Sequence, residues 1–317
     1  MKTITARERD LILDVTGEGL TRLSPGILEK DLLITEVLRQ ASAFEHQGVQ
    51  LVFCGGTCLS KAHGIIERMS EDVDFKVVIT NPDRSSSSRR KLLSNFKNSL
   101  ASYFRATELE VTEAGIAARN ENSYITFNLQ YQSQFPAVAS LRPEIKLELN
   151  ASPPKKPTQL LPLRTLLHEA LNDRPSPPMI QCLGIDETLQ EKVLGFLRRT
   201  AEVMAKRHRG EIDHRLIRHV YDVHAITQAR PDLVTGLSES EFQERIGDDA
   251  RQFGNQFPEF IADPLGQMRQ ALAALQNESR FENDYRNFVD DLVYGNSVGF
   301  NEARSAFAAV SERLLAR

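Results

Sequence analysis

One short segment, residues 50–79, restricts the fold of this chain more than any other. An apolar run, QLVFC at 50–54, ends in Gly55 and Gly56 and is followed by a stretch compatible with a helix. The chain then continues as DVDFKVVI at 72–79, which alternates at first and then becomes apolar, as a buried strand does. The order of strand, double glycine, helix and strand predicts an α/β arrangement in this part of the chain.

The double glycine and the residues after it are suited to binding phosphate. Glycine lets the backbone approach a ligand closely, and a helix N-terminus offers unpaired N–H groups to anionic oxygens. We therefore expect Gly55, Gly56 and Thr57 to cradle a triphosphate. Lys61, one turn into the expected helix, adds a positive charge.

Two carboxylates, Asp72 and Asp74, follow on the second predicted strand. Residues two apart on a strand point to the same face, so the two acids would lie side by side. Their mutual repulsion is relieved by a divalent cation, because Mg²⁺ favours hard oxygen ligands and bridges to substrate phosphates. A pair of such ions can activate an attacking hydroxyl group and stabilise a leaving pyrophosphate. The pattern therefore predicts Mg²⁺ or Mn²⁺ at these acids.

A third acid is expected from a neighbouring strand. The segment RPEIKLELN at 142–150 alternates with period two, which places its apolar and charged residues on opposite faces. Glu148 is the first candidate for the third metal ligand, because it shares a strand face with Lys146. Glu144 is the second candidate.

The remaining pattern predicts two domains. Alternating segments support an α/β domain with a small mixed sheet over residues 1–150. Seven prolines between 151 and 180 favour a connection over residues 151–185. From 186 to 317 the chain is predicted to be a helical bundle, which we expect to close over the nucleotide.

Composition excludes several classes of protein. A formal net charge of −4 argues against a chain-wide nucleic-acid coat but allows a local basic patch. The three cysteines, Cys54, Cys58 and Cys182, give no disulfide framework, and we expect them to pack in the core. The N-terminus is too charged for a secretory signal, and no apolar run approaches the roughly 20 residues of a membrane helix. A cytoplasmic location is therefore expected.

The segment at 53–75 resembles the nucleotidyltransferase toxins of the AbiEii/AbiGii type. The pattern of that family is G-G-[ST]-x-L-x-K, a spacer, and then R-x-S-x-D-x-D-F. This chain supplies Gly55, Gly56, Thr57, Leu59, Lys61, Arg68, Ser70, Asp72, Asp74 and Phe75. Upstream, ILEKDLLITEVL at 27–38 is similar to a helix that precedes the motif in one branch of the family. There we expect Glu29 and Lys30 to form an ion pair that supports the site.

Two downstream segments extend the resemblance, EKVLGFLRR at 191–199 and RHVYDVHAI at 218–226. They are similar to the lysine helix and to the R-H-x-Y-D segment of the family. The residues assigned in this way are Lys192, Arg218, His219, Tyr221 and Asp222. The resemblance implies that Lys192 and Asp222 take part in nucleotide handling. Lys61, Lys192 and Arg68 would neutralise the charge of the triphosphate. Many relatives have aspartate in place of His219.

The resemblance implies a specific activity. A nucleoside monophosphate would be moved from a nucleoside triphosphate to an acceptor, with release of pyrophosphate. Asp72 and Asp74 would hold Mg²⁺, and Glu148 would assist or act as a base. Family behaviour implies an RNA acceptor such as a tRNA 3′ end, a role as the toxin of a type IV toxin–antitoxin or phage-defence system, and a cognate antitoxin.

Two alternatives stay open. A metal-dependent nuclease would use Asp74 with Glu144-x-Lys146, which follows the acid-x-Lys pattern of restriction-type nucleases. The glycine-rich helix entry is not needed by such an enzyme. A catalytically silent nucleotide-binding scaffold in a defence complex is the second alternative, and the complete aspartate pair argues against it.

Overall fold

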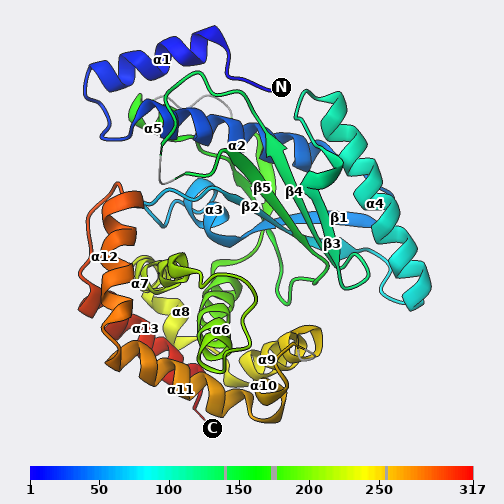
Figure 1. The fold of residues 1–317 in the computed structure, drawn as a ribbon, viewed down its shortest axis with the longest axis vertical. Helices are drawn as coiled ribbons and strands as arrows, with labels where there is room; N and C mark the ends of the chain where they lie inside the picture. The colour runs from blue at the N-terminus through cyan, green and yellow to red at the C-terminus, as the bar shows by residue number, and fades with distance from the viewer. Residues whose placement is uncertain (139–140, 173–176, 254–255, 317) are drawn as a thin grey trace. The chain divides into compact units, whose positions relative to one another are not determined.

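The computed structural model describes residues 1–138, 141–172, 177–253 and 256–316. The chain divides into two compact units (Figure 1). The first, called the sheet unit, comprises Met1–Gly64 and Arg68–Gly184. The second, called the helical unit, comprises Ile65–Glu67 and Ile185–Arg317.

A seven-stranded mixed sheet forms the centre of the sheet unit, with the strand order β3-β4-β5-β2-β1-β7-β6. The strands are β1 (Val49–Cys54), β2 (Asp72–Ile79), β3 (Ile116–Arg119), β4 (Tyr124–Gln130), β5 (Glu144–Asn150), β6 (Gln159–Pro162) and β7 (Met179–Cys182). β2 pairs with β5 in parallel and with β1 in antiparallel orientation, and β1 pairs with β7 in parallel. The prediction of a mixed α/β sheet is confirmed.

Alternation along the strands gives the central part of the sheet an apolar and a polar face. In β4 and β5 every second residue is buried, and the residues between them are half-buried. Helix α4 (Ser86–Ala106) lies against the apolar face, where the ring of Phe104 is 6.1 Å from that of Phe127. Helix α2 (Pro25–Ala43) reaches α4 through Gln40, which accepts a hydrogen bond of 2.5 Å from Thr107. The polar face carries the carboxylates predicted on β2 and β5.

The other helices of this unit are α1 (Ala6–Gly17), α3 (Gly55–Lys61) and α5 (Leu166–Ala170), with a short 3₁₀ helix at Glu113–Gly115. The helix expected after the double glycine ends at Lys61. The chain turns at Gly64, whose φ is +64°, and a Cβ there would lie 2.3 Å from Arg164. Residues 107–115 alternate like a strand but form only the 3₁₀ helix and a bridge at Glu110.

The proline-rich stretch expected as a connection over 151–185 contributes β6, α5 and β7 to the sheet unit. β7 pairs with β1 through Cys182 and Phe53, and β6 pairs with β7 at the end of the strand order. A proline is tolerated in β6 because edge strands do not need every N–H group. The boundary between the two units falls after Gly184.

All named elements of the helical unit are helices, as predicted from residue 186 onward. They are α6 (Ile185–Met204), a 3₁₀ helix (His214–Ile217), α7 (Arg218–Ala229), α8 (Pro231–Thr235), α9 (Glu239–Phe253), α10 (Pro258–Ala262), α11 (Pro264–Asn277), α12 (Arg280–Leu292) and α13 (Phe300–Leu314). Aromatic contacts join them: the ring of Phe196 in α6 lies 5.0 Å from Phe307 and 5.9 Å from Phe281.

The three cysteines are buried and free, as expected from their sparse number. They come from the end of β1, from α3 and from the end of β7. Burial, reinforced by the neighbouring thiol of Cys182, raises the pKa of Cys58 well above its ordinary value. These thiols therefore form part of the packed core next to the double-glycine bend.

Three consecutive charged residues of α2 are buried, Glu29, Lys30 and Asp31. Asp31 forms an ion pair of 2.5 Å with Lys61 and accepts a hydrogen bond of 2.9 Å from the Leu166 N–H group. The expected ion pair between Glu29 and Lys30 is not formed, because Lys30 pairs with Glu71. Neighbouring positions on a helix diverge, so each side chain holds a different part of the unit.

Replacing Asp31 with Asn tests the buried pair. The change leaves the buried ammonium group of Lys61 without its counter-charge, and the free energy of unfolding should fall by about 3 to 5 kcal/mol. Urea unfolding of the two proteins measures the difference. The second change Lys61→Met in the same chain removes the stranded charge and should restore part of the loss.

The matched control is Arg39→Gln, which removes an ion pair with Glu36 whose arginine is half exposed. It should cost less than about 1 kcal/mol, because exposed ion pairs contribute little. Equal losses for Asp31→Asn and Arg39→Gln would show that the buried pair has no special role.

Candidate functional site

The predicted carboxylates lie together on the polar face of the sheet. In the parallel pairing of β2 and β5, Asp74 is opposite Glu148 and Asp72 is opposite Lys146. Paired residues and residues two apart project from the same face. Asp74 also pairs with Cys54, the last residue of β1. The sheet therefore brings the three acids onto neighbouring positions beside the end of β1.

The double-glycine bend contacts Asp74 directly. Gly55 has a φ of +77°, a conformation that L-residues rarely adopt. A Cβ at this position would lie 2.2 Å from Asp74 Oδ2, closer than non-bonded atoms can approach. Only glycine therefore allows the backbone to pack against this carboxylate.

Behind the bend, the side chains expected to form a phosphate cradle are tied to one another. The buried hydroxyl group of Thr57 lies 2.9 Å from Ser70 Oγ and donates a hydrogen bond to the Asp72 carbonyl. Arg68 is buried, and its guanidinium group donates to the carbonyl of the next residue. A Cβ on Gly56 would lie 2.6 Å from Arg68 Nη2, so glycine is needed here as well.

Lys61 is also enclosed, with 4% of the residue exposed and its ammonium group on Asp31. A lysine held by a buried counter-ion is poorly placed to meet a substrate. Neutralisation of a triphosphate by Lys61 and Arg68 stays a prediction. Their described contacts favour a supporting role for both, beneath the bend and β2.

Two basic side chains pair with the acids. Sequence reasoning gave Lys146 a role only in the nuclease alternative and did not single out Arg142. Arg142 Nη1 is 2.5 Å from Asp72 Oδ1, and Lys146 forms an ion pair with Glu148. The alternation of β5 places Lys146 on the acidic face. Arg142 precedes the strand, so its orientation could not be inferred from periodicity.

Tyr124 of β4 is a further residue of this face that the sequence did not single out. Burial raises its pKa above the ordinary value, and the carboxylate of Glu148, to which its hydroxyl group donates a hydrogen bond, raises it further. Asp74 acts in the same direction. The register of β4 with β5 would have revealed this neighbour, because Tyr124 is two residues from the position opposite Glu148.

The donor set fits a hard divalent cation. In the parts of the chain that the structure describes, no three acidic, histidine or cysteine side chains converge in a metal-holding group. Mg²⁺ needs only one or two protein carboxylates, because water and substrate phosphates complete its shell. Asp72 and Asp74 supply hard oxygen donors on one face of the sheet. The missing side chain of Gly55 leaves space for the carboxylate of Asp74. Glu148 as a third metal ligand stays a prediction.

In the helical unit, the structure brings together the two residues assigned by resemblance. Lys192 of α6 and Asp222 of α7 form an ion pair of 2.8 Å between Nζ and Oδ2. Asp222 is fully buried and Lys192 nearly so. Such a pair holds the lysine ammonium group in a defined position.

His219 packs on the same part of α6. Burial lowers its pKa well below the ordinary value, and the charges of Lys192 and Arg218 lower it further. The ring is therefore neutral at pH 7, and its Nδ1–H group donates to the Lys192 carbonyl at 3.0 Å. A Cβ on Gly195 would lie 3.3 Å from the ring, so the small residue lets the histidine approach α6. His219 thus fixes the backbone that carries Lys192.

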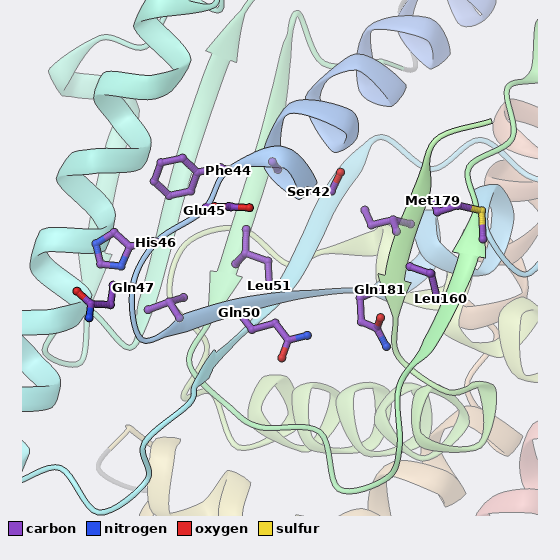
Figure 2. A pocket seen from close by; sticks show the side chains of 13 residues that line it. Ser42, Phe44, Glu45, His46, Gln47, Gln50, Leu51, Leu160, Met179 and Gln181 are labelled. Atoms are coloured by element: carbon purple, nitrogen blue, oxygen red, sulfur yellow. The ribbon is translucent and has the colours of Figure 1, made fainter. Parts of the chain in front are cut away.

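A cavity of about 690 Å³ in the sheet unit lies away from the acids. Figure 2 shows it between the end of α2, the start of β1, the strand β7 and the edge strand β6. Phe44, Leu51 and Leu160 are among the residues that line it, and no predicted site residue is. Asp74 pairs with Cys54 at the opposite end of β1. The candidate active site is therefore the polar sheet face and not this cavity.

None of the helices in the described ranges combines the length and the apolar character that a membrane span requires.

An aspartate pair packed beside a double-glycine bend on a mixed sheet is the arrangement expected of a nucleotidyltransferase. A sequence-family model described as "Nucleotidyl transferase AbiEii toxin, Type IV TA system" matches residues 36–310. The chain belongs to this family of nucleotidyltransferase toxins from type IV toxin–antitoxin systems, which confirms the resemblance seen in the motifs.

No curated protein matches the sequence. Among solved structures, the chain is similar to MenT4, a nucleotidyltransferase toxin from Mycobacterium tuberculosis H37Rv. The two share 15% sequence identity, with a TM-score of 0.47, over 97% of this chain and 92% of that chain.

Replacing Gly55 with Ala tests the packing of the bend on Asp74. The added methyl group must displace the carboxylate, so affinity for Mn²⁺ should fall by roughly ten-fold or more. Isothermal titration calorimetry measures the affinity. The positive φ adds a strain of about 1 to 2 kcal/mol, which thermal unfolding detects.

Gly19→Ala is the matched control. Its φ of +68° produces the same backbone strain, but a Cβ there meets no atom within 4 Å. Stability should fall in both variants and Mn²⁺ affinity only in Gly55→Ala. Equal Mn²⁺ affinity in the two variants would show that the bend takes no part in the proposed metal binding.

Proposed function

We propose that this chain is a Mg²⁺- or Mn²⁺-dependent nucleotidyltransferase that moves a nucleoside monophosphate from a nucleoside triphosphate to RNA, such as a tRNA 3′ end. The observation that carries the proposal is the packing of Asp74 against Gly55, with Asp72 on the same sheet face. The family match over residues 36–310 supports the same class of reaction.

In the proposed reaction, an acceptor hydroxyl oxygen forms a bond to the α-phosphorus of the triphosphate. The bond from that phosphorus to the bridging oxygen breaks, and pyrophosphate leaves with the electron pair. A bound divalent cation would supply the positive charge that stabilises both oxygens. Asp72 and Asp74 would hold it, and their position on a strand keeps the geometry rigid.

Glu148 is proposed to accept the proton of the attacking hydroxyl group. It is opposite Asp74 in the register of β5 on β2, and the hydroxyl group of Tyr124 and the ammonium group of Lys146 orient its carboxylate. A base must lie within hydrogen-bonding reach of the proton that it removes, and a carboxylate next to the metal ligands meets that requirement.

The backbone of Gly55, Gly56 and Thr57 is proposed to contact the triphosphate, with Ser70 supporting Thr57. Backbone N–H groups at the start of a helix attract anionic oxygens, and the absence of side chains lets them approach. Lys192 is proposed to contribute a cation to nucleotide handling. Its ion pair with Asp222 would hold the ammonium group in place.

The biological role proposed is that of the toxin of a type IV toxin–antitoxin or phage-defence system, acting in the cytoplasm and opposed by a cognate antitoxin. The family description supports the toxin–antitoxin assignment. A cytoplasmic location fits this role, because nucleoside triphosphates and tRNA are both abundant in the cytoplasm.

Incubation with each α-³²P-labelled nucleoside triphosphate and total RNA tests the proposal. Transfer gives labelled RNA of the same or greater length, and the label identifies the preferred nucleotide. A nuclease using Asp74, Glu144 and Lys146 would shorten the RNA without adding label, and a silent scaffold would do neither.

Asp74→Asn and Asp72→Asn should lower the rate of label transfer on the order of a thousand-fold, because each removes a ligand of the proposed cation. Circular dichroism should show that both variants keep the fold. Asp83→Asn, in an exposed position after β2, is the control and should transfer at the wild-type rate. Transfer at the wild-type rate by both site variants would refute the mechanism.

A further inference from the structure

Arg142 makes a contact that the proposed function does not explain. It lies just before β5, and its guanidinium group is 2.5 Å from Asp72 Oδ1. The arginine side chain is 35% exposed, whereas that of Asp72 is 11% exposed. A partly solvated cation therefore contacts a carboxylate that is otherwise largely enclosed.

The backbone of Arg142 is fixed independently of its side chain. Its N–H group donates to Glu71 Oε2 at 2.8 Å, and its carbonyl accepts from Lys30 Nζ at 2.5 Å. Lys30 and Glu71 form an ion pair of 2.6 Å with side chains 0% and 8% exposed. Because both anchors use backbone atoms, they hold Arg142 in place whichever way the guanidinium group points.

The guanidinium group and a divalent cation would compete for the negative charge of Asp72. Mg²⁺ binds a carboxylate oxygen at about 2.0 to 2.1 Å, so a cation on Asp72 would lie within a few ångströms of the guanidinium group. Two positive charges at that separation repel, and arginine cannot lose its proton to relieve the repulsion. This repulsion favours displacement of the Arg142 side chain when the cation arrives, while its backbone stays anchored.

We propose that Arg142 is a charge-exchange residue, which neutralises Asp72 before the cation binds and moves to a phosphate oxygen of the triphosphate when it does. The inference rests on the proposed function, because it takes Asp72 as a metal ligand. A guanidinium group matches phosphate oxygens in two parallel hydrogen bonds, which makes the triphosphate a suitable new partner.

This exchange would couple the binding of cation and nucleotide. Without nucleotide, the cation has to displace Arg142 and binds weakly. With nucleotide, the released guanidinium group gains a partner, so both bind more tightly together. Reciprocity requires that the cation raise nucleotide affinity by the same factor.

The test measures Mn²⁺ binding by electron paramagnetic resonance of the free ion, with and without a non-hydrolysable nucleoside triphosphate. In Arg142→Gln without nucleotide, Mn²⁺ affinity should rise about five-fold, because the competing ion pair is gone. With Mn²⁺ present, nucleotide affinity should fall roughly ten-fold, because a charge-assisted contact is lost. Arg142→Lys should lie between the two proteins.

Arg105→Gln is the matched control, since Arg105 is similarly exposed and pairs with Glu113 at 2.6 Å, away from β2. It should bind Mn²⁺ and nucleotide as the wild type does. The melting temperature of Arg142→Gln should fall only slightly, because the lost ion pair is partly exposed and Lys30 and Glu71 still hold the backbone at this position.

Unchanged or weaker Mn²⁺ binding by Arg142→Gln without nucleotide would overturn the exchange, since it would show that Arg142 does not compete for Asp72. Failure of the proposed function gives a different result. In that case the wild type binds Mn²⁺ no better than Asp72→Asn and Asp74→Asn, whatever residue stands at 142.

Discussion

The site depends on the packing of one carboxylate against a backbone that has no side chain. Asp74 occupies the space that a Cβ on Gly55 would fill, and this contact fixes where β1 ends and where the chain turns. The hydrogen bonds of Thr57 to Ser70 and to the Asp72 carbonyl then join the bend to the strand that carries both acids. The geometry of the candidate site is thus set by steric contact before any ligand arrives.

Buried charges on α2 provide the support around this contact. Removing a charge from water is costly, and a buried pair adds little net stability over a well-packed apolar pair. Lys30 and Asp31 therefore contribute mainly by positioning the segments that they contact. Lys30 contacts the backbone before β5, and Asp31 contacts the end of α3. One turn of α2 therefore fixes the position of two segments that border the acids.

The sequence was most informative where local pattern and tertiary structure agree. Alternation gave the bounds of β2 and most of β5, which begins at Glu144 and not at Arg142. It also predicted the shared sheet face of Asp72 and Asp74, and the pairing of β2 with β5 places Glu148 opposite Asp74. It was less informative where the partner is distant. The burial of Lys61 depends on Asp31, 30 residues earlier in the chain, and local helix pattern does not reveal it. Short strands that contain proline, such as β6, look like loops in the sequence because their strand propensity is low. Pairing with a neighbouring strand, here β7, stabilises them.

The clustered thiols beside the bend have a practical consequence. Because Cys58 is enclosed and its pKa is raised, it is protonated and shielded in the native state. A thiolate-directed alkylating reagent can then react only in molecules whose core has opened. The alkylation rate of Cys58 would report, from inside the protein and without an added dye, how often the region next to Gly55 opens. Ligands that rigidify the bend would slow that reaction in proportion to their occupancy.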